Sequence, residues 1–324
     1  MLAPRLVDST ESISAHADPE HILAVIRYAP CAGSPVPPCL TIDLPLRPLE
    51  TGYSEVWSCE GPVERGEVAG VRFAHNGHTL IGAVACDART LAQGFESAIA
   101  DAYGRISQAA TAAAFPHFLR MWNYLPDIHR MEGVFNRYQL FCRARYEPLT
   151  THCKGRHDGY PAATAIGTHS DEAVIYFLAS RQPGRHLENP RQESAYRYPE
   201  RYGPQSPSFA RATLGEMDSR MWLFVSGTAS IVGHESRHRA DIVAQCNEVL
   251  ANIDRLLKTA DAQRGLETLS HIKVYLRRAD HLAAVRGILE EALPKTDPRL
   301  ILQGELCRSE LLLEIEGLAM RQRT

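Results

Sequence analysis

Two carboxylates near the end of the chain are the residues best suited to acid–base chemistry. Glu314 and Glu316 lie in the apolar run 311–317. Side chains alternate between the two faces of a strand, so both carboxylates are expected on one face beside Leu312. That face could simply be solvated. If one of the two carboxylates instead lines a pocket shielded from water, its pKa is raised and it can donate a proton near neutral pH.

The surrounding segment suggests how these carboxylates are positioned. Two apolar runs within 299–317 are joined by a polar break at 307–310, a pattern that predicts two paired strands. In a simple hairpin turning at Arg308, Cys307 would lie about 15 Å from Glu314, at ~3.3 Å per residue. A bulge or a bent strand would be needed to bring the thiol to the carboxylate.

Residues 234–238 read His-Glu-Ser-Arg-His. On a helix this spacing places two imidazoles on one face as zinc ligands, with the glutamate as general base. The motif directly follows a strand-like run that ends at Gly233, and the apolar face of the next helix starts only at Ile242. We therefore favour a loop that binds anions at the start of a helix, with help from Thr228, over a zinc hydrolase.

The segment 188–211, called the connector below, is dense in tyrosine, arginine and proline. Disordered linkers are usually poor in aromatic residues, so we expect the connector to be ordered. It either offers arginine and tyrosine side chains to an anionic ligand or packs between two domains.

Composition narrows the class of protein. The chain has 324 residues, 44% hydrophobic and 23% charged, with a net charge of −3, which fits a globular protein without a nucleic-acid surface. No apolar run approaches the ~18–20 residues that span a bilayer, and no secretory signal is evident, so we expect a cytoplasmic protein. The eight cysteines are scattered without a Cys-x-x-Cys pair, which indicates reduced thiols rather than a metal site.

The order of helices and strands occurs twice. In each half a helix, a strand and a second helix are followed by two strands, with matching starts offset by roughly 150 residues, which indicates duplicated units. The first copy is expected at 90–114, 119–125, 131–147, 162–167 and 173–179, and the second at 239–258, 271–276, 280–293 and the closing strands. This predicts an α+β fold of two units, each a mixed β-sheet covered on one face by two helices.

We divide the chain into an N-terminal unit, 1–190, with an extended N-terminal arm, and a C-terminal catalytic domain, 191–324, that includes most of the connector. Only the second unit ends in the doubled carboxylate, since the equivalent run 174–178 has no acidic residue. If one unit is catalytic, we expect the second.

These motifs together resemble a known family. Residues 215–324 resemble a YjgF/RidA domain, which has a chorismate-mutase-like fold, through Ser-Gly-Thr-Ala at 226–229, Ile-Lys-Val-Tyr-Leu at 272–276 and Leu-Glu-Ile-Glu-Gly at 313–317. The whole chain is similar to the chorismatases, on the strength of the connector and of 226–238.

The resemblance implies that the enolpyruvyl group of chorismate is removed as pyruvate without a metal or an organic cofactor. Glu314 would protonate the methylene carbon of the enol ether. Arg299 matches the carboxylate-binding arginine of YjgF-type sites, and Gln205 stands where an arginine is expected. Further candidates for substrate binding are Tyr198, Arg211, Arg220 and Thr228.

The same resemblance bears on the product. Gly233 with Cys307 resembles members that form 3-hydroxybenzoate through attack of the ring hydroxyl. A related branch gives both 3- and 4-hydroxybenzoate, and other members give a dihydroxy-cyclohexadienoate. Cys307 could equally be a small buried apolar residue.

Two other functions remain open from the sequence. An imine or enamine deaminase of the RidA type would use Arg299 and Glu314 on a small imino acid, but it does not account for the connector or for the first unit. A metabolite sensor without catalysis is the other. Either a homotrimer or a pseudo-symmetric monomer is compatible with the duplication.

Overall fold

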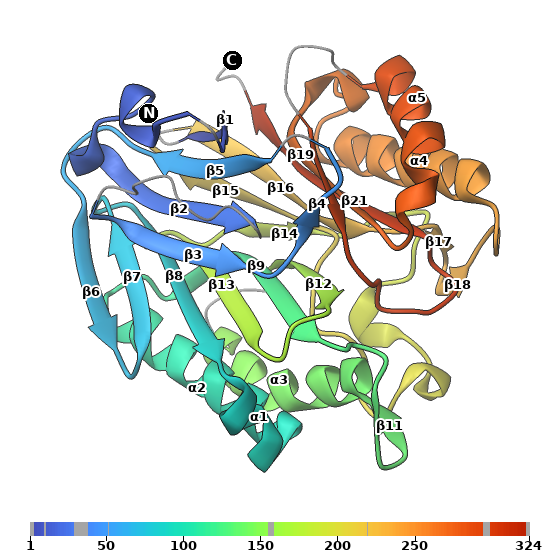
Figure 1. Ribbon diagram of the computed structural model, residues 1–324, viewed down its shortest axis with the longest axis horizontal. Coiled ribbons are helices and arrows are strands. Elements are labelled where there is room, and N and C mark those ends of the chain that lie inside the picture. Colours follow the sequence, from blue (N-terminus) through green and yellow to red (C-terminus); the bar gives the residue numbers. More distant parts are fainter. Residues whose placement is uncertain are drawn as a thin grey trace.

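The computed structural model describes residues 3–9, 11–28, 38–50, 52–154, 159–218, 220–293 and 299–321. Three large β-sheets share a hydrophobic core between them, and the helices lie on the outside (Figure 1). Within the described ranges, no helix is long and apolar enough to cross a bilayer. The proline-rich stretch 30–37 of the N-terminal arm lies outside the described residues.

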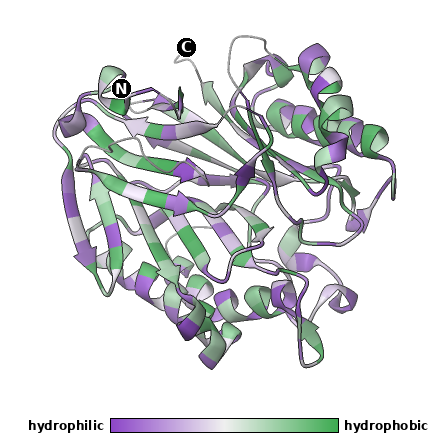
Figure 2. Ribbon diagram, in the orientation of Figure 1, coloured by the Kyte–Doolittle hydropathy of each residue, from purple (hydrophilic) through white to green (hydrophobic). Residues whose placement is uncertain are grey.

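The first unit is a six-stranded sheet in the order β12-β9-β13-β8-β7-β6. Its strands are β6 (Glu64–Val68), β7 (Val71–His75), β8 (Thr79–Cys86), β9 (His117–Pro126), β12 (Ala162–Thr168) and β13 (Ala173–Ser180). One face is covered by α1 (Ala88–Gln93), α2 (Phe95–Ala112) and α3 (Arg137–Cys153). In Figure 2 the central strands are largely hydrophobic, whereas the edge strand β6 is largely hydrophilic.

The second unit is a seven-stranded sheet in the order β14-β15-β16-β21-β19-β20-β4. Its strands are β4 (Arg47–Pro48), β14 (Arg185–Leu187), β15 (Ala212–Met217), β16 (Arg220–Thr228), β19 (Leu269–Leu276), β20 (Leu300–Gln303) and β21 (Leu313–Arg321). The helices α4 (Ile242–Ala260) and α5 (Leu282–Ala292) cover its outer face. Apart from β4, its strand order repeats that of the first unit element by element, so the predicted duplication is confirmed.

The predicted hairpin of the two closing strands is wrong. β20 pairs in parallel with one side of β19, and β21 pairs antiparallel with the other side. The segment 304–312 crosses the end of β19, where Gly304 N–H donates to Leu276 O at 3.0 Å and Arg277 N–H donates to Leu312 O at 3.0 Å. Because this segment is a crossover rather than a tight turn, Cys307 is not held away from Glu314 by strand length.

The segment before the first unit is a third sheet rather than an extended arm. Its order is β1-β5-β2-β3, with β1 (Ala3–Asp8), β2 (Ile22–Tyr28), β3 (Leu40–Leu44) and β5 (Tyr53–Ser58). Its inner side chains join those of the other two sheets in one core cluster. For example, the rings of Trp57 on β5 and Trp122 on β9 meet edge to face at 6.3 Å.

The start of α3 also differs from the prediction. Residues 131–136 form a small hairpin, β10 (Met131–Glu132) with β11 (Phe135–Asn136). Asn136 then begins the helix with a capping box, in which its side chain accepts from Gln139 N–H at 2.9 Å and the Gln139 side chain accepts from Asn136 N–H at 3.0 Å. This reciprocal pair satisfies two backbone donors and sets the helix start at Arg137.

Candidate active site

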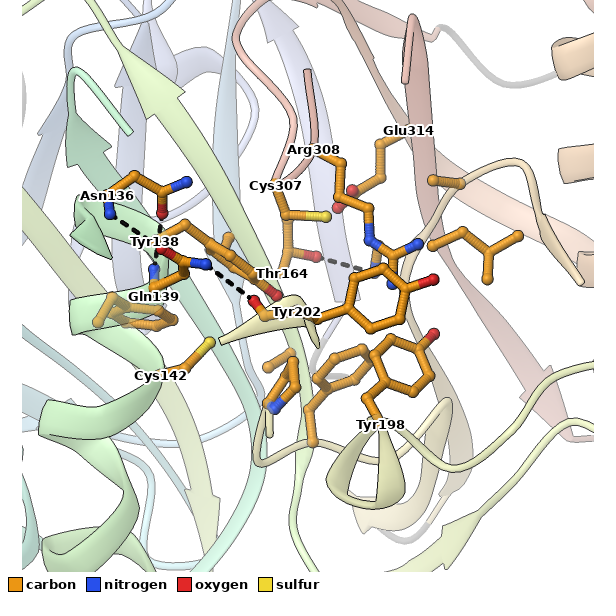
Figure 3. Close-up of a pocket in the computed structure, with 18 of the residues that line it drawn as sticks. Asn136, Tyr138, Gln139, Cys142, Thr164, Tyr198, Tyr202, Cys307, Arg308 and Glu314 are labelled. Carbon is orange, nitrogen blue, oxygen red and sulfur yellow. Dashed lines mark hydrogen bonds between the residues drawn. The ribbon is translucent and has the colours of Figure 1, made fainter. Parts of the chain in front are cut away.

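A cavity of about 260 Å³ lies between the two units. Its walls come from α3 and β12 of the first unit, from the connector, and from the ends of β16 and β21 together with the crossover 304–312. Figure 3 shows Glu314, Cys307 and Arg308 on one side and Tyr138 and Cys142 of α3 on the other. The cavity is therefore shared between the units, because α3 and β12 belong to the first and Glu314 to the second.

Glu314 is the buried acid of this cavity. It lies on β21 and is 5% exposed, and its carboxyl group makes no hydrogen bond with another described residue. Burial, with a contribution from the charge of Glu316, raises its pKa to about 8, against the opposing effects of Arg120 and Arg211. Glu314 is therefore predominantly protonated at neutral pH and can act as a general acid.

A glycine makes room for this carboxyl group. A Cβ atom placed on Gly227 would overlap Glu314 Oε1, so a larger residue there would displace the carboxyl from its position. The Gly227 N–H donates to Thr164 Oγ1 at 2.9 Å, which fixes the backbone at the end of β16 against β12.

Glu316 has the opposite environment, although it lies two residues away on the same face of the strand. Its carboxylate accepts from Arg120 Nη2 at 2.7 Å and from Trp122 Nε1 at 2.7 Å, and it lies 3.0 Å from Lys273 Nζ. Burial alone would raise the pKa of Glu316, but Lys273 and Arg120 outweigh it and hold the pKa below its ordinary value. Two carboxyl groups with pKa values driven apart are the usual arrangement of a proton donor beside a fixed charge.

Two buried arginines in the cavity wall carry unused donors. Arg145 on α3 and Arg211 at the end of the connector are 2% and 4% exposed. Arg145 Nη2 donates to Ser208 O at 3.1 Å, and Arg211 Nη2 donates to Tyr198 Oη at 2.7 Å. The Nε atoms of both arginines are buried without a hydrogen-bond partner among the described residues. A buried donor without a hydrogen-bond partner lowers the stability of the folded protein, so these guanidinium groups are suited to bind an anionic ligand.

An aromatic cluster closes the rim of the cavity. The guanidinium of Arg308 lies 3.9 Å from the ring centre of Tyr202, which ends the short turn η4 (Glu200–Tyr202). Arg308 Nη1 also donates to His234 O at 2.9 Å, and the Tyr202 and His234 rings are 5.8 Å apart. These contacts join the connector to the crossover 304–312 at the mouth of the site.

Thiols line the same cavity beside Tyr138. Burial raises the pKa of Cys307 to about 12, with a further contribution from the charge of Glu314. Burial likewise raises the pKa of Cys142 to about 12. Both thiols are therefore protonated at neutral pH and serve as small, weakly polar walls rather than as nucleophiles.

Known proteins of similar sequence and structure match this chain over most of its length. Residues 55–179 match the family described as Chorismatase FkbO/Hyg5-like, N-terminal, and residues 209–321 match the one described as Endoribonuclease L-PSP. A 3-hydroxybenzoate synthase of Streptomyces hygroscopicus is 38% identical over 321 residues, which cover 93% of this chain and 92% of that protein. The chain belongs to the chorismatase family. A chorismatase of Streptomyces rapamycinicus is 36% identical over 83% of this chain and 82% of its own length. A crystal structure of a chorismatase has a TM-score of 0.85 and 31% identity, covering 98% of both chains.

The structure brings together five of the residues that the chorismatase resemblance suggested for the site. The residues on the cavity wall are Glu314, Cys307, Tyr198, Gln205 and Arg211. Their convergence depends on the crossover 304–312 and on the connector, which meet where Arg308 lies against Tyr202.

Four other candidates do not line the cavity. Arg220 begins β16, seven residues and roughly 23 Å of strand from Gly227, at ~3.3 Å per residue, and its Nη1 lies 3.3 Å from Met320 Sδ. Arg299 precedes β20, which β19 separates from β21, and its Nη2 donates to Leu293 O at 3.3 Å. The structure therefore contradicts the expectation that these two arginines clamp a ligand beside Glu314.

The other two candidates are Thr228 and Gly233, which lie near the site. The Thr228 hydroxyl donates to Ser226 O at 2.9 Å. Gly233 is the turn between β17 (Ile231–Val232) and β18 (Glu235–Ser236), with φ +59°, and its N–H donates to Arg191 O at 2.9 Å. Neither faces the cavity, so the expected roles of Thr228 in binding and of Gly233 in catalysis have no contact with that space.

The zinc hydrolase reading of 234–238 is wrong. This segment contains β18 and a turn, and α4 begins only at Ile242, so the two imidazoles do not share a helix face. His238 Nε2 lies 3.2 Å from a Glu248 carboxylate oxygen, whereas His234 contacts Tyr202. Over the described ranges, no group of three or more His, Cys, Asp or Glu is arranged to hold a metal ion.

The site residues that come from the first unit were not predicted from the sequence. Arg145 follows Phe141 by four positions and lies on the buried face of α3. An arginine at the helical spacing of apolar residues was therefore the feature of the sequence that could have indicated a buried, functional side chain. The sequence indicated a role for Arg308 in the site less clearly, because Arg308 lies in a polar break that resembles an ordinary turn.

Proposed function

We propose that this protein removes the enolpyruvyl group of chorismate as pyruvate and releases 3-hydroxybenzoate, 4-hydroxybenzoate, or both, with Glu314 as the proton donor. Chorismate has the same atoms as pyruvate and hydroxybenzoate together, so the conversion consumes no water. The proposal is supported most strongly by Glu314, a carboxyl group with a pKa of about 8 that faces a cavity.

The chemistry explains why such a group is needed. Protonation of the enol-ether methylene carbon creates an oxocarbenium-like centre, and carbon is protonated less readily than oxygen. A carboxyl group that stays protonated at neutral pH supplies the proton, and its conjugate base would then lie near the positive centre. Heterolysis of the ring C–O bond then releases the three-carbon unit as pyruvate. The positive charge left on the ring is removed by loss of a ring proton, which balances the proton donated by Glu314 and gives the aromatic hydroxybenzoate.

The two carboxylates of chorismate require cationic partners. Arg145 and Arg211 have buried Nε donors without partners among the described residues. Arg211 is one of the candidates that the resemblance suggested, and Arg145 would take the place of Arg299 and Arg220. Because guanidinium groups bind carboxylates with paired hydrogen bonds, these two arginines would orient the substrate as well as bind it.

The protein should release pyruvate from chorismate in an assay coupled to lactate dehydrogenase, and chromatography should identify the aromatic product. Glu314→Gln is expected to lower kcat by roughly 10²- to 10⁴-fold, the range typical for loss of a general acid. Glu216→Gln is the matched control, because Glu216 is exposed on β15. Absence of pyruvate with folded protein would overturn the activity, and full activity in Glu314→Gln would overturn the role of Glu314.

Substrate binding is tested separately. Arg145→Met and Arg211→Met are each expected to raise KM for chorismate by roughly 10- to 100-fold, the equivalent of one charged hydrogen bond. An unchanged KM in both variants would remove them as clamps. The deaminase alternative has no support from the cavity, since Arg299 lies elsewhere. Turnover of 2-aminoacrylate without turnover of chorismate would nevertheless restore it.

A further inference from the structure

Four charged side chains are buried together where the three sheets meet. Lys273 Nζ on β19 lies 3.0 Å from Glu55 Oε2 on β5 and 3.0 Å from Glu316 Oε1 on β21. Arg120 Nη2 on β9 lies 2.7 Å from Glu316 Oε2. Each sheet contributes at least one member of this charge cluster, and none of the four lines the cavity.

Neutral donors complete the charge cluster. Trp57 Nε1 donates to Glu55 Oε1 at 2.6 Å, and Tyr28 Oη donates to Glu55 Oε2 at 3.1 Å. The Thr164 hydroxyl donates to Glu316 Oε2, as does Arg120. With two carboxylates and two cations, the cluster has no net charge, which is the condition under which buried ions are tolerated.

The charge cluster is adjacent to Glu314. The charged and titratable groups that face Glu314 are Glu316 on its own strand, Arg120 on β9, Arg211 of the connector, Cys307 of the crossover and, as its pairing partner on β19, Tyr275. Both cations of the cluster are engaged by the carboxylates of Glu55 and Glu316. An ionised Glu314 would therefore be an additional buried negative charge that the cluster does not compensate.

We propose that Glu55 is a positioning residue for the reaction, because by binding Lys273 it keeps the buried charge cluster neutral and leaves no unpaired cation to stabilise ionised Glu314. The N-terminal sheet thus supplies the charge that keeps the proton donor of the second unit protonated. This inference rests on the proposed function of Glu314.

The expected size of the effect follows from the contacts. Glu55 and Glu316 are each 3.0 Å from Lys273 Nζ, and Glu314 is two strand residues beyond Glu316. A charge at a total separation of roughly 12 Å, in an effective dielectric of about 20, changes a pKa by about one unit. Removal of the Glu55 charge leaves an excess cation and lowers the pKa of Glu314, whereas removal of the Lys273 charge leaves an excess anion and raises it.

The test compares Glu55→Gln, Lys273→Met and the double variant with the unaltered protein. Tyr28→Phe is the matched control, since it removes a hydrogen bond from Glu55 without changing charge. The readouts are the titration midpoint of the Glu314 carboxyl by infrared difference against Glu314→Gln, and the alkaline limb of kcat/KM for chorismate. From a starting midpoint of about pH 8, we expect a fall of about one unit in Glu55→Gln, a rise of similar size in Lys273→Met, and a return to the starting value in the double variant.

Opposite shifts that cancel in the double variant support the inference, because a purely structural role would not change sign. If Glu55→Gln does not fold, Lys273→Met and the double variant still differ by the Glu55 charge alone and carry the same comparison. Midpoints that coincide in all folded variants would overturn the inference, as would an equal shift in Tyr28→Phe. Failure of the proposed function is distinguishable, since the unaltered protein would then release no pyruvate from chorismate, or Glu314→Gln would retain full activity, whatever the infrared midpoints show.

Discussion

Replacement of Glu314 by glutamine should change how the stability of the protein depends on pH. The unfolded chain has an ordinary glutamate, with a pKa near 4.5, whereas burial raises the pKa of Glu314 in the folded protein to about 8. Between these values the folded protein holds one proton that the unfolded chain releases. The stability of the unaltered protein therefore falls with rising pH, relative to Glu314→Gln, by about 1.4 kcal/mol per pH unit.

Below about pH 4.5 both states are protonated, and above about pH 8 both are ionised, so the difference is confined to that window. Across it the accumulated difference is roughly 5 kcal/mol, with Glu314→Gln the more stable at high pH. Urea unfolding of both proteins at several pH values measures this difference in the free energy of unfolding. The contributions of all other titrating groups cancel because both proteins share them. A difference that does not change with pH would refute the assignment of a raised pKa to this residue.

Three further changes test the surroundings of the site. Gly227→Ala would place a methyl group against the Glu314 carboxyl. We expect kcat to fall by roughly 100-fold with the fold retained, as for a catalytic group misplaced by about 1 Å. An unchanged kcat would mean that the carboxyl can move aside without loss of function. Arg120→Met removes a partner of buried Glu316 and should lower the free energy of unfolding by about 3–5 kcal/mol, which urea denaturation would detect and equal midpoints would contradict. Cys307, with its pKa of about 12, should react with iodoacetamide at pH 8 roughly a thousandfold more slowly than a free cysteine; rapid labelling by mass spectrometry would show an accessible thiolate instead.

The elements that depend on local pattern were predictable from the sequence. The apolar spacing in 90–114 predicted one helix where the structure has two, α1 and α2, divided at Gly94. Alternation in the last strand correctly places Glu314 and Glu316 on the same face. The duplicated order of helices and strands could also be read directly, because each copy repeats the same periodicities.

Features that depend on distant pairing were not predictable in this way. β19 lies between β20 and β21 in the sheet. Two neighbouring apolar runs in the sequence do not indicate that a third strand separates them. The third sheet is assembled from short strands separated by turns, and its inner residues are buried only because two other sheets enclose them. Arg145 faces the site through the packing of α3 against the connector, and no local signal states where a helix will pack.

The most direct test of the account is the pH dependence of kcat/KM for chorismate, which reports the ionisation of the free protein. If Glu314 must be protonated to deliver its hydrogen to the substrate carbon, kcat/KM should be constant near neutrality and fall tenfold per pH unit above about pH 8. A profile that stays flat well beyond pH 9, or that rises through this range, would contradict the claim that a buried, protonated Glu314 performs the reaction.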